Sequence, residues 1–180
     1  ENNSDDLPGF GAGIYVDGSE LQIEDSWIEW NNSSSGSGGG IYMTNNSEAY
    51  FVETNVRNNN ALKQGGGFYI DNASVDYAGG YISANKAYDS GGAFFITNSS
   101  NVNLSYIAMD TNESAEVGGG ENTIGGGLGI VFDSEVNFYQ CTVYGNNSIS
   151  GGVSGLYSDN SNININNSSQ NIENTNKLRV

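Results

Sequence analysis

A four-residue block recurs along the whole chain at nearly constant spacing. Successive copies are 27, 27, 26, 36 and 26 residues apart. The copies are Gly13-Ile14-Tyr15-Val16, Gly40-Ile41-Tyr42-Met43, Gly67-Phe68-Tyr69-Ile70, Ala93-Phe94-Phe95-Ile96, Gly129-Ile130-Val131-Phe132 and Gly155-Leu156-Tyr157-Ser158. A repeat of this length predicts a solenoid, in which each copy is one structural unit stacked on the next.

Two further blocks follow the first block in most copies. The second alternates apolar and polar residues, as in Leu21-Gln22-Ile23 and Val75-Asp76-Tyr77, which is typical of a strand with one buried face. The third begins with an apolar residue and ends three residues later in an asparagine. These asparagines are Asn31, Asn59, Asn85, Asn112 and Asn146.

Three short strands separated by Gly, Asn, Asp and Ser turns predict one coil of a single-stranded parallel β-helix. We therefore expect an all-β domain over residues 1–180, with about six coils of roughly 27 residues. An antiparallel sandwich would not repeat three strand types in fixed order, and a propeller blade needs about 40 residues. Parallel strand connections favour a right-handed coil.

The charge of the chain limits its partners. Its 180 residues include five Lys and Arg, 21 Asp and Glu and no His, so the formal net charge is −16. Nucleic acid and anionic membranes are disfavoured, because phosphate binding needs clustered basic residues. Cations, neutral glycans and basic surfaces remain compatible. No apolar stretch approaches the length of a membrane helix, and the start at Glu1 indicates a mature or excised segment.

Stacking of coils turns each sequence column into a row of side chains about 4.8 Å apart. The second and fourth residues of the first block, such as Ile14 and Val16, should point inward. The asparagine column should form a ladder of amides, each bonded to the amide one coil away, at a turn with left-handed backbone. Cys141 is the single cysteine and should be a small buried side chain.

The middle residues of the first strand should face outward as an aromatic row. The row consists of Tyr15, Tyr42, Tyr69, Phe95 and Tyr157, and Val131 interrupts it. Such a row could stack against the sugar rings of a ligand or pack against a neighbouring protein. It could also simply stabilise the sheet. We take these five residues as candidate ligand-binding residues.

A turn column follows the first strand and contains Asp17, Thr44, Asp71, Thr97, Asp133 and Asp159. Asp and Thr cap turns by hydrogen bonding nearby amides. Asp133 and Asp159 would be neighbours on adjacent coils, where their charges could attract Ca²⁺, although the sequence otherwise predicts no cofactor and no metal site. Asn72 and Asn98 begin glycosylation sequons in this turn, so N-glycans are expected there.

Separate features lie in the long step, which is the spacing of 36 residues between the fourth and fifth copies, and at the two ends of the chain. Residues 115–126 form an insertion rich in glycine, and a tail covers 175–180. Both ends fall at the same position within the repeat unit and carry opposite charges. These two features predict head-to-tail stacking of copies. The assembly residues would be Glu1, Asp5, Asp6, Lys177 and Arg179.

The glycine-rich first block and the apolar-x-x-Asn element together resemble the passenger repeats of chlamydial polymorphic outer membrane proteins. More broadly, the chain resembles right-handed β-helix proteins of the pectate-lyase-like fold. The first resemblance implies a surface adhesin and the second raises the question of polysaccharide cleavage. The Gly-His and Arg-x-Lys elements of polygalacturonases are absent. Arg57, Lys63 and Lys86 are the only bases in the body of the chain, and no motif brings acids to them.

The sequence therefore predicts a non-enzymatic, extracellular or cell-surface protein with a structural or adhesive role. It would be a head-to-tail fibre subunit or a segment of a surface solenoid, with copies of itself or cell-surface glycans as partners. The alternative is a β-helix that binds or cleaves polysaccharide. In that case a carboxylate pair such as Glu24 and Glu29, or Glu53 and Asp76, would face each other across coils.

Overall fold

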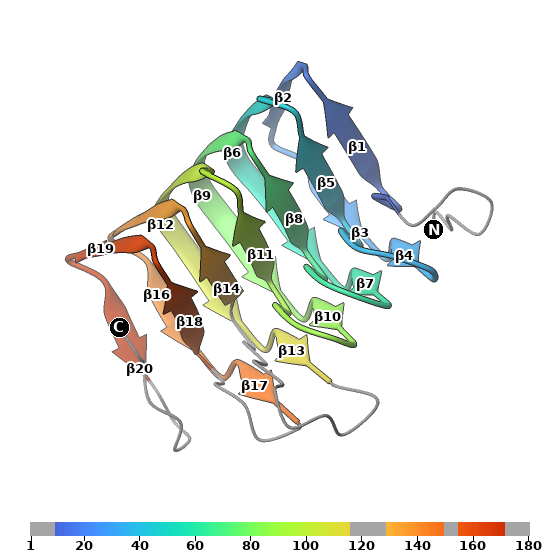
Figure 1. The fold of residues 1–180 in the computed structure, drawn as a ribbon. Helices are drawn as coiled ribbons and strands as arrows, with labels where there is room; N and C mark the ends of the chain where they lie inside the picture. The colour runs from blue at the N-terminus through green and yellow to red at the C-terminus, as the bar shows by residue number, and fades with distance from the viewer. Residues whose placement is uncertain (1–9, 116–128, 150–154, 172–180) are drawn as a thin grey trace.

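The chain folds into a parallel β-helix, as the repeat predicts. The computed structural model describes residues 10–115, 129–149 and 155–171. Every element in these ranges is a strand, and every strand pair is parallel. The coils stack along one axis, with β1 (Ile14–Asp17) near one end and β18 (Leu156–Asp159) near the other (Figure 1). Among these residues, no helix has the length and apolar character needed to cross a bilayer.

The first sheet contains the recurring aromatic block. Its six strands lie in the order of the sequence, so that each coil adds one strand beside the last. They are β1, β5 (Ile41–Thr44), β8 (Phe68–Asp71), β11 (Phe94–Thr97), β14 (Gly129–Phe132) and β18. Tyr15 pairs with Tyr42 and Tyr42 with Tyr69, which confirms the predicted alignment over the first coils.

The predicted second and third strands share one nine-stranded sheet. In three middle coils they form one continuous strand of ten residues each: β6 (Glu48–Arg57), β9 (Ser74–Ser83) and β12 (Asn101–Asp110). In the other coils they are separate: β2 (Glu20–Glu24), β3 (Trp27–Glu29), β15 (Glu135–Tyr139), β16 (Thr142–Tyr144), β19 (Asn162–Asn166) and β20 (Ser169–Asn171). A bend at left-handed residues such as Glu53 and Tyr106 turns the strand without ending it.

A third sheet occupies the segment that directly follows the asparagine column, where the sequence predicts only a turn. Its strands have two residues each, and hydrogen bonds to the coils on either side keep them in register. They are β4 (Asn32–Ser33), β7 (Asn60–Ala61), β10 (Lys86–Ala87), β13 (Glu113–Ser114) and β17 (Asn147–Ser148). Such short strands carry too little alternation to be read from sequence.

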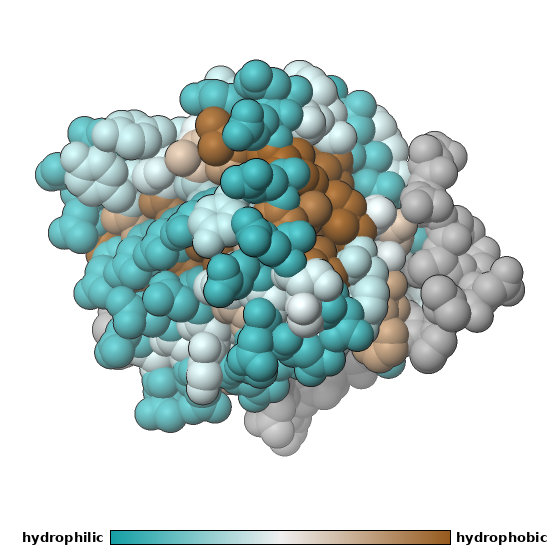
Figure 2. All heavy atoms as spheres, turned by 90° about the horizontal axis from the view of Figure 1, so that it is seen from above, coloured by the Kyte–Doolittle hydropathy of each residue, from teal (hydrophilic) through white to brown (hydrophobic). Residues whose placement is uncertain are grey.

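The core fills the interior of the coils. The predicted inward residues of the first sheet are fully buried in the middle coils, among them Ile41, Met43, Phe68 and Ile70. The view from above shows hydrophobic residues between bands of hydrophilic ones (Figure 2). Tyr77 also points into the core, where its hydroxyl donates a hydrogen bond of 2.6 Å to the carbonyl oxygen of Thr54.

The register after the long step differs by one residue from the predicted one. Gly129, and not Ile130, pairs with Phe94, so Val131 falls in the inward column and is fully buried. A Cβ on Gly129 would lie 3.3 Å from the Cβ of Phe94 and 3.2 Å from Cδ1 of Leu156. Glycine thus fits between two large inward side chains, which explains why packing favours this register.

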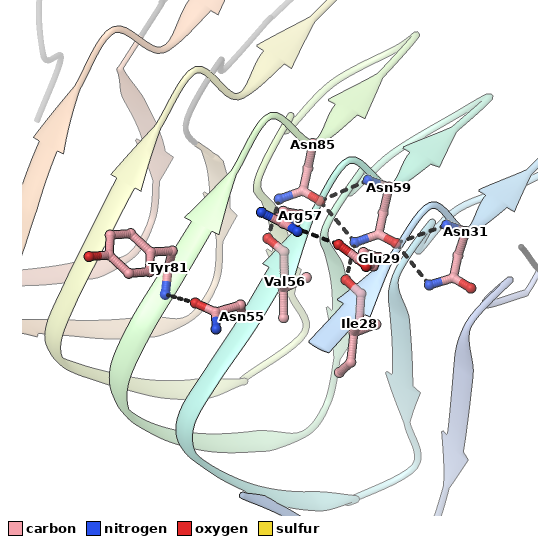
Figure 3. Close-up of polar contacts among 9 residues, drawn as sticks. All are labelled: Ile28, Glu29, Asn31, Asn55, Val56, Arg57, Asn59, Tyr81 and Asn85. Atoms are coloured by element: carbon pink, nitrogen blue, oxygen red, sulfur yellow. Dashed lines mark hydrogen bonds and ion pairs between the residues drawn. The ribbon is translucent and has the colours of Figure 1, made fainter. Parts of the chain in front are cut away.

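The asparagine ladder is confirmed. The side-chain amide of Asn59 donates to Oδ1 of Asn85 at 3.0 Å, and the same amide donates to the carbonyl oxygen of Ile28 at 2.9 Å. The same pattern joins Asn31, Asn59, Asn85, Asn112 and Asn146. Figure 3 shows the first three of these asparagines. The left-handed residue, however, is the one before each asparagine, such as Asn58 and Ala84. The amides therefore satisfy backbone groups at the corner.

Candidate functional site

The predicted aromatic row exists, but its rings face one another. Tyr42 and Tyr69 stack with ring centroids 4.6 Å apart and planes 13° from parallel, and Tyr69 and Phe95 stack at 5.3 Å and 3°. Tyr42 is only 7% exposed, whereas Tyr15 is 49% exposed. Burial raises the pKa of Tyr42 and of Tyr69 above the usual tyrosine value. This arrangement favours a stabilising role, since most ring faces are covered by other rings.

After the long step, the aromatic row continues through a residue at a different position of the repeat. Ile130 pairs with Phe95 and Tyr157 in the backbone register. The ring of Phe132 lies 5.7 Å from Phe95 and 6.0 Å from Tyr157. The ring of Phe132, two residues after Ile130, thus bridges the interruption of the row, whereas Val131, which the sequence places in the row, points inward.

Exposed aromatic side chains gather instead on the outer face of the nine-stranded sheet, past the bend. Trp27 is 57% exposed and Tyr81 is 56% exposed. Strand alternation directs them outward, because their neighbours Ile28 and Ile82 point into the core. We call this surface the tryptophan–tyrosine face and define it by Trp27, Glu29, Asn55, Arg57, Tyr81, Asp110 and Tyr144.

Contacts between coils hold the side chains of the tryptophan–tyrosine face in place. Nε of Arg57 donates to a carboxylate oxygen of Glu29 at 2.7 Å, and the guanidinium lies 4.2 Å from the centroid of the Trp27 ring. Oδ1 of Asn55 accepts a hydrogen bond of 3.1 Å from the backbone N–H of Tyr81 (Figure 3). The face therefore combines exposed rings with ordered polar groups.

A second pair of aromatic residues extends this face on later coils. A hydrogen bond to Asp110 raises the pKa of the Tyr144 phenol. At the bend, the exposed rings of Tyr106 and Tyr139 meet edge to face at 5.6 Å. Sequence reasoning missed this surface, although a signal was present: Trp27 and Tyr81 both stand directly before the apolar head of the third block.

The turn after the first sheet forms a second candidate site. Turns of two lengths alternate here: Asn45-Asn46 and Asn98-Ser99 each contain two left-handed residues, whereas the intervening coil has the single left-handed residue Asn72. A trough of about 680 Å³ lies along these turns. Its lining consists of Thr44, Asn45, Asp71, Asn72, Asn98, Ser99, Asp133 and Asn160.

Asp133 and Asp159 are neighbours on adjacent coils, since the backbone N–H of Asp133 donates to the carbonyl oxygen of Asp159 at 3.2 Å, but the shift of register offsets their alignment by one residue. Asp159 pairs with Phe132, and the side-chain amide of Asn160 donates to Oδ1 of Asp133. An amide donor, and not a second carboxylate, thus lies beside Asp133 in the turn. Within the described ranges, no group of three or more His, Cys, Asp or Glu side chains could hold a metal ion.

The bases and acids considered for catalysis lie apart or in surface pairs. Glu29 is paired with Arg57, and Lys86 with Glu113 at 2.5 Å. Glu24 pairs across coils with Val52 and not with another acid. The carboxylate of Glu53 lies over Gly79, where a Cβ would be 2.4 Å from its Oε1. Lys63 is exposed on a turn.

The remaining predicted residues are placed as follows. Cys141 is buried, as expected, and burial raises the pKa of its thiol. Asn98 is exposed and Asn72 is partly exposed, so both sequons reach the surface. The assembly residues Glu1, Asp5, Asp6, Lys177 and Arg179 lie outside the described residues, as do the tail at 175–180 and all of the insertion except Ala115.

No protein-family model, curated protein or solved structure matches the chain. The fold itself is shown by the parallel register of three sheets at the repeat spacing. The finer resemblance to chlamydial passenger repeats and to pectate-lyase-like proteins stays a prediction.

Proposed function

We propose that this protein is a non-enzymatic adhesive β-helix of the extracellular space or cell surface, which binds glycan on its tryptophan–tyrosine face. The observation that supports the proposal is the exposure of Trp27 and Tyr81 on a sheet whose neighbouring side chains are fixed by coil-to-coil contacts. Exposed aromatic rings with polar neighbours are typical of surfaces that bind sugars or proteins.

The spacing of the two rings fits an extended chain molecule. Trp27 and Tyr81 occupy one column two coils apart, with Asn55 between them. Two coils correspond to about 9.6 Å along the axis, which is close to the length of a disaccharide unit in an extended β-linked glycan. Rigid positioning of such groups lowers the entropy lost on binding.

The acidic surface favours neutral over anionic glycans. The net charge of −16 repels uronic acids and sulfated sugars at long range. On the face itself, the single cation Arg57 is already paired with Glu29, so it offers little to an added carboxylate. We therefore expect neutral, extended glycans as partners, without cleavage.

The test is a glycan array followed by titration of the best neutral oligosaccharide, together with a reducing-sugar assay on the parent polysaccharide. We expect binding, no release of reducing ends, and at least a tenfold loss of affinity in Trp27→Ala and Tyr81→Ala. Tyr88→Ala is the matched control, because Tyr88 is an exposed tyrosine of another segment. Equal binding by all three variants, or sugar release, would overturn the proposal.

An extracellular location also implies modification of the exposed sequons. Asn98 has an exposed side chain, whereas Asn112 lies buried in the amide ladder. In a glycosylating host we expect glycan on Asn98, and on Asn72 to a smaller extent, but not on Asn112 of the folded protein. Peptide mapping by mass spectrometry checks this; glycan on Asn112 in folded material would contradict it.

A further inference from the structure

The alternating turns after the first sheet give one edge of the solenoid a corrugated shape. The two longer turns, Asn45-Asn46 and Asn98-Ser99, flank the shorter turn at Asn72. They lie two coils apart, about 9.6 Å along the axis. The open trough between and beside them lies at the opposite end of the long strands from the tryptophan–tyrosine face.

Hydrogen-bonding groups of both kinds line this trough. The side-chain amide of Asn98 donates to Oδ1 of Asp71 at 2.7 Å, which fixes both side chains across adjacent coils. A carboxylate has about four acceptor sites and an amide two N–H donors, so this pair keeps unused capacity of both kinds. Asn45, Asn72 and Thr44 add further amide and hydroxyl groups.

Such a lining matches the chemistry of adjacent hydroxyl groups on a sugar ring. Each hydroxyl donates one hydrogen bond and accepts others, and a carboxylate can accept from two neighbouring hydroxyls at once. Asp71 and Asp133 would repel a carboxylate or sulfate on the ligand, and no basic residue lines the trough. The trough, of about 680 Å³, is wide open to solvent, so a ligand would lie in a shallow groove and would not be enclosed.

We propose that this trough is a second binding site, which takes one or two neutral sugar units through their adjacent hydroxyl groups. Asp71 supplies the carboxylate acceptor, Asn98 holds that carboxylate in place, and the turns at Asn45-Asn46 and Asn98-Ser99 form the walls. This site does not depend on the tryptophan–tyrosine face.

A glycan on Asn72 or Asn98 would cover the trough, so this proposal applies to the unglycosylated protein. The experiment is a nuclear magnetic resonance titration of the full chain, produced in a host without N-glycosylation, with mannotriose, cellotetraose and, as the acidic probe, trigalacturonate. Side-chain amide signals of Asn45, Asn72 and Asn98 should shift with at least one neutral sugar and not with trigalacturonate. Asp71→Asn should weaken that binding at least tenfold, because it removes the carboxylate but keeps an acceptor for Asn98.

Asp17→Asn is the matched control. Asp17 forms the corresponding bond with Asn45, at 2.6 Å, but does not line the trough. Its replacement should leave the affinity unchanged, although it changes the net charge equally. Trp27→Ala should also leave the trough signals unchanged, which separates this proposal from the adhesive one. Absence of shifts with every neutral sugar, equal binding of trigalacturonate, or equal loss in Asp71→Asn and Asp17→Asn would overturn it.

Discussion

The side-chain amide of Asn85 donates a hydrogen bond of 3.0 Å to Oδ1 of Asn112 on the next coil, and both side chains are fully buried. Oδ1 of Asn85 in turn accepts from both the backbone N–H and the side-chain amide of Asn59. One side chain therefore satisfies groups on both neighbouring coils. Because this geometry repeats from Asn31 to Asn146, the ladder fixes the register of the corner along these coils.

Asn85→Ala should destabilise the protein strongly. The change leaves two donors of Asn59 and the carbonyl oxygen of Val56 without their partner in a buried corner. Each unsatisfied buried group costs about 1–3 kcal/mol, so we expect a loss of about 3 kcal/mol or more. Unfolding in urea measures it. Asn103→Ala is the control, since the exposed Asn103 donates to Oδ1 of Asp76 and accepts from the side-chain amide of Asn137, and its loss should cost less than about 1 kcal/mol. Equal losses at the two positions would contradict the role of the buried ladder.

Gly80→Ala should be among the most damaging single substitutions. Gly80 has a φ of 99°, and a Cβ there would lie 2.0 Å from the carbonyl oxygen of Thr54 on the preceding coil. The backbone would have to move at the place where Tyr77 bonds the same oxygen. We expect a loss of about 3 kcal/mol or more.

Gly155→Ala provides the comparison for Gly80→Ala. A Cβ at Gly155 meets no atom of the described residues within 4 Å, so its change in stability should stay within about 0.5 kcal/mol. Thermal unfolding of the two variants beside the parent measures the difference. A Gly80→Ala protein as stable as the parent would show that the coils do not approach closely at the bend.

Stability should fall at high pH because of the buried tyrosine Tyr77. Burial raises its pKa well above the usual value, so the folded state favours the neutral phenol. Tyr77 therefore does not change the free energy of unfolding below about pH 10, the pKa of an exposed tyrosine. Its contribution lowers the free energy of unfolding as the pH rises above that value.

Tyr77→Phe tests this pH dependence. The variant loses the hydrogen bond to Thr54, at a cost of about 1–2 kcal/mol near neutral pH. Its stability should fall less steeply above about pH 10. Thermal midpoints measured across the alkaline range check both effects, with Tyr88→Phe as the exposed control. A slope identical to that of the parent would mean that Tyr77 does not carry the effect.

Cys141 should react with thiol reagents only when the solenoid opens. Its side chain is buried, burial raises the pKa of the thiol, and Sγ lies 3.3 Å from the carbonyl oxygen of Leu104. The thiolate is the reactive form, so native protein should react far more slowly than protein in denaturant. Timed labelling with a chromogenic disulfide measures the ratio. Fast labelling of native protein, at the rate of the unfolded chain, would contradict the buried placement.

Several features of the fold could be predicted from the sequence. The period, the inward columns and the amide ladder all depend on residues that recur at fixed positions, such as Phe68 and Asn59. Each copy carries its own alternation of apolar and polar residues, and stacking at one strand spacing converts that alternation into rows. The burial of Cys141 follows from the same alignment of equivalent positions in successive copies.

Only the tertiary structure decided the register after the long step and the character of the surfaces. Near Gly129 the local sequence allows two alignments, and packing between Phe94 and Leu156 selects one of them. Tyr42 and Tyr81 both occupy outward positions in their strands, yet Tyr42 is covered by stacked rings while Tyr81 stands exposed. The physical reason is that exposure depends on the neighbouring coils, whereas the sequence of one strand determines only which face its side chains point to.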